Sequence, residues 1–241
     1  MVRNTTFSIF YPPINNIREQ IFKLETELSE YFVKPFNLIP IPNEAPPEFP
    51  RMTATSNHGY TNLNISINST QIITNYDSNF SNDWAKCESY ILDRANRIYD
   101  LLSPFFANRI LFCGLTTDLL IEVSNKNAVD KIKGSLFRLE SDKPYDLLGK
   151  VTFVKDEKYY LNYLIQNQRF PNPIGIVGIP LKMLETDNFI ELNIDVNDRY
   201  AFNYGNNYAS SKEVFGEIIG ITRKIVNEKI DKIINEGRFD I

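Results

Sequence analysis

Apolar and polar residues alternate along several stretches of this chain, and such alternation predicts β-strands with one buried face. The clearest case is 60–68, where Leu63, Ile65 and Ile67 share one side and polar residues lie between them. The stretch 188–197 shows the same alternation of aliphatic and polar residues. Further strands are expected at 5–11, 49–56, 71–76, 109–123, 148–155 and 158–167.

Apolar residues spaced three and four apart predict helices in the remaining segments. The stretch 82–106 has one apolar stripe at this spacing, formed by Trp84, Cys87, Ile91, Ala95, Ile98, Leu102 and Phe105. Helices are also expected at 14–32, 127–139 and 210–235. Ser210 followed by Glu213 predicts a capping box at the start of the last helix.

The predicted elements repeat along the chain. Residues 1–107 contain a strand, a helix, three strands and a long helix, and residues 108–241 contain the same series. This order predicts an α+β fold of two tandem β-α-β-β-β-α modules. One antiparallel-rich, eight-stranded sheet with the long helices packed on one side would bury the apolar faces of both modules.

A proline-rich segment at 33–50 interrupts the first module. Its prolines exclude a helix and a central strand, so we expect an extended conformation. Phe36, Leu38, Ile39 and Ile41 make it too apolar for a free linker. We interpret it as a strap across the core, and a partner-binding arm is the alternative because a stiff segment binds at low entropic cost.

Composition narrows the classes of function. Hydrophobic residues make up 43% of the 241 residues and the net charge is −4, so the chain can form a large core and lacks the basic field of a dedicated nucleic-acid binder. Cys87 and Cys113 lie in apolar patterns, which favours buried free thiols. The absence of a leader-like start or a long apolar run predicts a cytoplasmic protein with no membrane partner.

Carboxylates provide the main candidate chemistry. Asp118 and Glu122, and likewise Glu191 and Asp195, lie in expected strands, and a metal-dependent nuclease or hydrolase would need such groups to converge. Solvated strand faces also carry carboxylates without any site. The single histidine, His58, is expected in a surface turn. No metal or cofactor motif occurs, so we expect neither a metal nor a cofactor.

The polar faces of the predicted strands provide the candidate binding residues. Asn62, Asn64 and Ser66 in the first module correspond in position to Asn193 and its neighbours in the second. Together with the four apolar strap residues, they would contact a ligand or partner, or else face solvent.

Two glycine pairs leave further alternatives open. The glycines in 175–178 belong to a packed loop or to a phosphate-binding loop. Gly216 and Gly220 pack inside the chain or form a homodimer contact.

Five residues carry a resemblance to a known family. Pro50 and Arg51 open a strand, Trp84 begins the long helix, and Gly114 and Leu115 lie in the strand that follows. Over about a third of its length the chain resembles an uncharacterised, sporadically distributed bacterial family of proteins of about 250 residues. The resemblance implies no activity and points to a phage-defence or mobile-element setting. We therefore expect a non-enzymatic, protein-binding regulatory accessory of a bacterial system.

Overall fold

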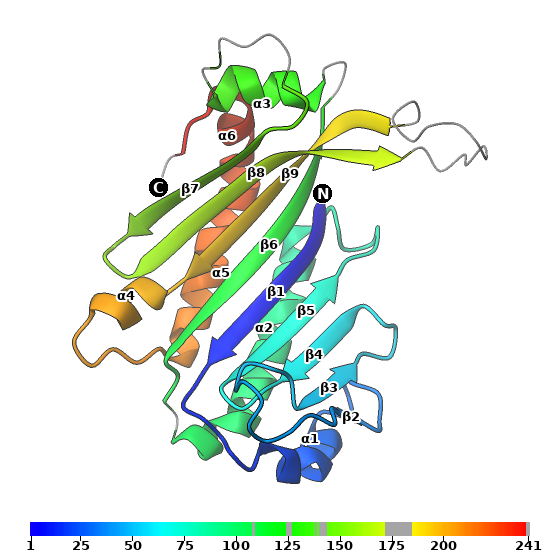
Figure 1. Ribbon diagram of the computed structural model, residues 1–241, viewed down its shortest axis with the longest axis vertical. Coiled ribbons are helices and arrows are strands. Elements are labelled where there is room, and N and C mark those ends of the chain that lie inside the picture. The colour runs from blue at the N-terminus through cyan, green and yellow to red at the C-terminus, as the bar shows by residue number, and fades with distance from the viewer. Residues whose placement is uncertain (108, 124–126, 138, 140–143, 172–184, 240–241) are drawn as a thin grey trace.

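In the computed structural model, the described residues form one antiparallel sheet of nine strands with the long helices on one face (Figure 1). The structure describes all residues except 108, 124–126, 138, 140–143, 172–184 and 240–241. The strands are β1 (Val2–Phe10), β2 (Asn37–Leu38), β3 (Met52–Thr55), β4 (Thr61–Ile65), β5 (Ser69–Asn75), β6 (Phe112–Glu122), β7 (Leu148–Lys155), β8 (Tyr159–Pro171) and β9 (Glu185–Asn197). The helices are η1 (Ile17–Gln20), α1 (Ile21–Glu27), α2 (Trp84–Leu102), η2 (Ser103–Phe106), α3 (Ala128–Leu136), α4 (Arg199–Tyr204), α5 (Lys212–Glu228) and α6 (Ile230–Glu236).

The strand order reveals the internal repeat. It runs β2-β3-β4-β5-β1-β6-β9-β8-β7, so β1 and β6 form the central antiparallel pair. The next three strands of each half follow outward in the same order, β5-β4-β3 on one side and β9-β8-β7 on the other. This arrangement confirms the predicted α+β fold of two modules in one sheet. The two-residue strand β2 is an addition that alternation could not reveal.

The core lies between the sheet and helices α2 and α5. The predicted stripe of α2 is buried from Trp84 to Leu102, as are the aliphatic residues of β9. Phe7 of β1 meets Phe215 of α5 edge to face at 5.0 Å. This core is continuous across the central strands β1 and β6. The module boundary expected between 107 and 108 therefore stays a prediction.

Helix ends differ from the predictions. The helix expected at 14–32 is reduced to η1 and α1, and turns bury Leu28 and Phe32 after α1 ends. The last helix divides near Lys229, where α5 ends and α6 begins. The capping box at Ser210 is wrong: α5 starts at Lys212, while Ser210 pairs with Ile110 in an isolated β-bridge.

Among the residues described, no helix has both the length and the apolar character needed to cross a membrane.

Candidate functional site

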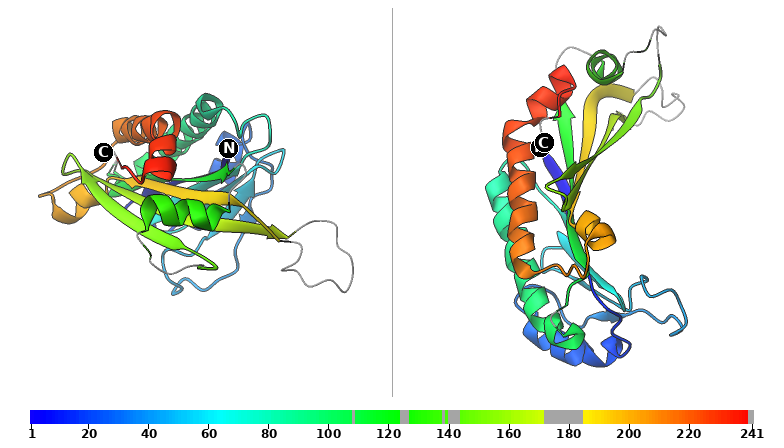
Figure 2. Two further views of the ribbon diagram at one scale, coloured as in Figure 1. Left: turned by 90° about the horizontal axis from the view of Figure 1, so that it is seen from above. Right: turned by 90° about the vertical axis from the view of Figure 1, so that its left-hand side faces the viewer.

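The sheet has one face covered by the long helices and one face without them. Figure 2, in its right panel, shows α2 and α5 along one side and only the short helix α4 on the other. We call the side opposite α2 and α5 the open face. Side chains alternate between the two faces of a strand, so each strand places on the open face the side chains that do not point into the core.

A row of residues crosses the open face through eight paired strands. In spatial order it contains Thr55, Asn62, Ile73, Thr6, Thr116, Asp195, Asn162 and Thr152. We call it the cross-sheet row. All of its members are half-buried or exposed, so each keeps some contact with solvent.

The row has matching residues at equivalent positions of the two modules. Thr6 and Thr116 stand opposite each other at the centre. In the outer strands of the first module, the Thr55 hydroxyl donates to Asn62 Oδ1 at 3.0 Å. In the second, the Thr152 hydroxyl donates to Asn162 Oδ1 at 2.8 Å. The repeated bond fixes the two amides in the same way in both halves.

Amide side chains hold the carboxylates of the second half. Asp118 accepts a hydrogen bond from Asn193 on the neighbouring strand. Glu191 accepts one from Gln166 Nε2 at 2.7 Å. These hydrogen bonds orient each carboxylate on the sheet.

Asp195 lies within the cross-sheet row and is the most enclosed of these carboxylates. Its Oδ2 accepts hydrogen bonds at 2.9 Å from both Asn162 and Asn197. Burial raises the pKa of Asp195, and the amide hydrogen bonds oppose that rise. Asp195 therefore presents a partly desolvated acceptor, which suits a cationic or hydrogen-donating group.

A cleft of about 210 Å³ opens beside Asp195, between the sheet and α4. Phe10 and Phe112 stack at 4.2 Å, and the Arg199 guanidinium lies 5.4 Å from the Phe112 ring centre. Gly114 is required in the cleft floor, because a Cβ there would lie 2.8 Å from Asn197 Cβ. The cleft thus combines aromatic surface with charges of both signs.

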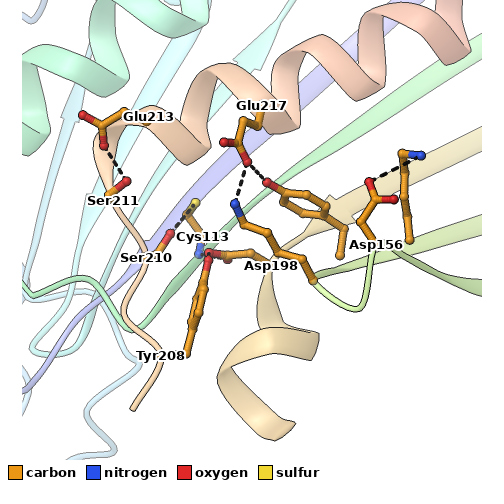
Figure 3. A network of polar contacts seen from close by, with 11 residues as sticks. Cys113, Asp156, Asp198, Tyr208, Ser210, Ser211, Glu213 and Glu217 are labelled. Atoms are coloured by element: carbon orange, nitrogen blue, oxygen red, sulfur yellow. Dashed lines mark hydrogen bonds and ion pairs between the residues drawn. The ribbon is translucent and has the colours of Figure 1, made fainter. Parts of the chain in front are cut away.

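A buried polar network anchors the end of the sheet next to this cleft. Figure 3 shows Cys113, Tyr208 and Ser210 gathered around Asp198. The fully buried Asp198 accepts hydrogen bonds at 2.7 Å from the Cys113 backbone N–H and from the Tyr208 hydroxyl. Burial, with Asp198 nearby, raises the pKa of the Cys113 thiol well above its ordinary value. The thiol is therefore a poor nucleophile, and the network has a structural role.

A second polar group joins β8 to α5 on the covered face. Glu217 accepts hydrogen bonds from the Lys158 ammonium at 2.6 Å and from the Tyr159 hydroxyl. Hydrogen bonds from Lys158 and Tyr159 lower the pKa of Glu217, while burial raises that of Tyr159. This group fixes α5 against the sheet and lies away from the open face.

The pairing of β6 with β9 places all four predicted carboxylates on the open face. Asp118 stands opposite Asn193, which lies between Glu191 and Asp195 on β9. Glu122 is exposed at the end of β6, opposite Phe189. Within the described part of the chain, no group of three or more His, Cys, Asp and Glu side chains is arranged to hold a metal ion.

The predicted polar residues of the first module divide into two groups. Asn62 and Asn64 are half-buried on β4. Ser66 follows the end of β4, is 3% exposed and donates its hydroxyl to the Ser69 carbonyl at 2.9 Å. Ser66 is therefore a turn residue and does not lie on a polar sheet face.

Two arginines fix the proline-rich strap. Arg51, 1% exposed, donates to the carbonyls of Ala45, Pro46 and Phe49. Arg18 donates to the carbonyls of Ile39 and Ile41.

The predicted strap residues differ in exposure. Phe36 is buried in the core, Ile39 and Ile41 are half-buried, and only Leu38 of the four is exposed. The strap thus packs on the core, and of its four predicted binding residues only Leu38 is exposed for contact with a partner.

Other sequence candidates lie away from the open face. His58 is in an exposed turn before β4. A Cβ added to Gly216 or Gly220 would meet no atom within 4 Å, so neither glycine is needed for packing inside the described chain. The loop 175–178 lies outside the described residues.

Sequence reasoning missed the partners of the predicted residues. Asn162 and Gln166 lie in the alternating pattern of β8 and could have been identified from it. No sequence pattern indicated that Phe10 and Phe112 stack beside the cleft, because only the pairing of β1 with β6 brings them together.

Comparison of the chain with protein-family models, with curated proteins and with solved structures found no match. The family resemblance carried by Pro50, Arg51, Trp84, Gly114 and Leu115 stays a prediction. The function is therefore argued from the geometry of the open face.

Proposed function

We propose that this protein is a non-enzymatic binding module that holds a protein partner against its open face, as a regulatory accessory of a bacterial system. The cross-sheet row carries the proposal. Its threonine–asparagine hydrogen bond recurs in both modules, between Thr55 and Asn62 and between Thr152 and Asn162. Folding alone does not require the same polar pair at two exposed sites.

The row has the dimensions of a peptide-binding surface. Eight strands at the usual spacing of about 4.8 Å span roughly 34 Å, the length of an extended segment of about ten residues. Hydrogen bonds to Asn162 and Asn197 already order the side chain of Asp195 before any partner arrives. Such preorganisation lowers the entropic cost of binding.

The charges on the open face indicate a basic partner segment. Asp118, Glu191 and Asp195 cluster on β6 and β9, and Arg3 lies 3.6 Å from Glu191 at the sheet centre. Carboxylates repel phosphate groups, so a nucleic acid fits this surface poorly. Lysine or arginine side chains of a protein partner would complement it. On the family resemblance alone, we propose a defence or mobile-element system as the setting of that partner.

Site-specific photocrosslinking in cells of a producing bacterium would test the proposal. A photoreactive residue replaces Thr116 on the open face, and a control carries it at the exposed Lys224 of α5. We expect a discrete protein adduct from position 116 only, and its loss on adding Asp195→Lys. Equal labelling from both positions, or adducts unaffected by Asp195→Lys, would refute the proposal.

The strap is tested by substitution rather than deletion. Removing 36–41 would also remove the buried Phe36, so loss of binding would report unfolding. Leu38 is 45% exposed, and Leu38→Asp changes only the surface. Weaker adduct formation with an unchanged melting temperature would support contact between partner and strap. An unchanged adduct would confine binding to the sheet.

A further inference from the structure

The two edges of the sheet are built differently. At one edge, β2 has two residues and lies in the proline-rich strap, which protects it from pairing. At the other edge, β7 has eight residues, contains no proline and pairs on one side only, with β8, among the described strands. A long, regular strand left open at a sheet edge is a template for pairing with another strand.

The backbone of β7 directs every second residue away from β8. The Leu147 carbonyl, just before the strand, accepts a hydrogen bond from the Asn167 N–H of β8. In an antiparallel pair the residues alternate in direction, so Val151 also points its backbone groups at β8. Lys150 and Thr152 then point their N–H and C=O groups outward, where a further strand would bind them.

Three apolar side chains of this edge strand are exposed to solvent. Leu148 is 60% exposed, Val151 37% and Val154 43%. Val151 lies on the helix-covered side of the sheet, while Leu148 and Val154 lie on the open side. Pairing with another strand would remove apolar surface from water on both sides.

We propose that β7 pairs with β7 of a second copy of this chain, antiparallel and centred on Val151. This register places Leu148 opposite Val154, Lys150 opposite Thr152, and Val151 opposite its own copy. Apolar residues thus meet apolar residues, and no two lysines are opposite each other. The strand is therefore complementary to itself, as a twofold contact requires.

Neighbouring registers are less favourable. A twofold axis at Lys150 would set that lysine against its own copy, a repulsive pair. An axis at Thr152 would set Leu148 opposite Asp156 and Lys150 opposite Val154, which mixes apolar with charged groups. The axis at Val151 also uses almost the full length of β7.

The dimer would continue the sheet without a break. Because the axis is perpendicular to the sheet, both copies keep their helices on the same side and their open faces on the other. Two cross-sheet rows would then lie on one continuous face. The pairing stands on the edge alone and does not depend on the proposed partner.

Light scattering on the purified chain tests the pairing. We expect twice the monomer mass of 27.9 kDa for the native chain and the monomer mass for Val151→Lys, which places two cations opposite each other. Val33→Lys, at a valine 47% exposed in the strap, is the matched control and stays dimeric. Far-ultraviolet circular dichroism confirms folding. A native monomer at high concentration, or a dimeric Val151→Lys variant, overturns the proposal.

Disulfide trapping tests the register separately. Across the axis, Val151→Cys would face its copy at a Cα separation of about 4.5 Å, within the range of a disulfide. Thr152→Cys would lie diagonally from its copy at about 7–8 Å, beyond that range. The native Cys87 and Cys113 are buried and do not interfere. Oxidative dimers from Val151→Cys alone support the pairing, and dimers from Thr152→Cys alone refute it.

Discussion

Arg51 provides the sharpest test of how the strap is held. Its guanidinium is buried and donates to three backbone carbonyls, at 2.7 Å to Ala45, 2.9 Å to Phe49 and 3.3 Å to Pro46. Arg51→Met keeps the apolar stem and removes all three hydrogen bonds. The chain between 45 and 49 then loses its attachment to the strand that follows.

The expected loss in free energy of unfolding follows from the type of hydrogen bond that is removed. A hydrogen bond to a charged group contributes about 1.5–3 kcal/mol, and the longest of the three contributes least. Water can satisfy the freed carbonyls, and removing a buried cation recovers part of its desolvation cost. We therefore expect Arg51→Met to lower the free energy of unfolding by about 2–4 kcal/mol.

Urea denaturation followed by tryptophan fluorescence measures this loss. The matched control is Arg18→Met, because Arg18 also donates to strap carbonyls but is only half-buried. We expect it to cost about 1 kcal/mol. Limited proteolysis should cut 39–49 much faster in Arg51→Met. Equal losses from the two variants would refute the argument that burial makes Arg51 the stronger anchor.

Three further predictions concern single residues. Burial raises the folded-state pKa of Asp195, so its contribution to stability is greatest below the ordinary aspartate pKa and falls as pH rises to the higher value. Asp195→Asn should remove this pH-dependent loss of stability, measured as the free energy of unfolding from denaturation curves. If the native chain and the variant differ in unfolding free energy by the same amount across this pH range, the prediction is contradicted. Burial raises the pKa of Cys113 and that of Cys87, the latter to about 12, so a thiol reagent at pH 8 should label both only in urea. Rapid labelling of the folded chain would disprove this. Gly237 has φ +64° and would place a Cβ 2.1 Å from a backbone oxygen at the end of α3. Gly237→Ala should therefore cost about 2–3 kcal/mol, whereas Gly216→Ala in open space should gain about 0.5–1 kcal/mol, with thermal melts deciding.

Most regular elements were predictable from the sequence because their periodicity is local. The stripe of α2 and the aliphatic side of β9 follow from spacings of 3.6 and 2 residues, and both are buried as expected. The repeated order of elements also indicated the two-module sheet. Helix ends were less predictable: Leu28 and Phe32 continue the apolar pattern in turns after α1 has ended.

The candidate site was predictable only in part. Alternation placed Asp118, Glu191 and Asp195 on polar strand faces, and the structure places them on one face. The same rule failed for Ser66, because the strand ends one residue earlier and the chain turns. The buried Asp198 gave no signal, since its hydrogen bond with the Cys113 backbone joins residues 85 positions apart.

The sequence by itself determined where most of the strands and the long helices form and which side of each is apolar. The tertiary structure alone decided which strands pair and in what register. Asp118 and Asn193 are 75 residues apart, and only the pairing of β6 with β9 makes them neighbours. Periodicity reports the environment of one element at a time, whereas the cross-sheet row and the open edge of β7 arise from hydrogen bonds between strands distant in the chain.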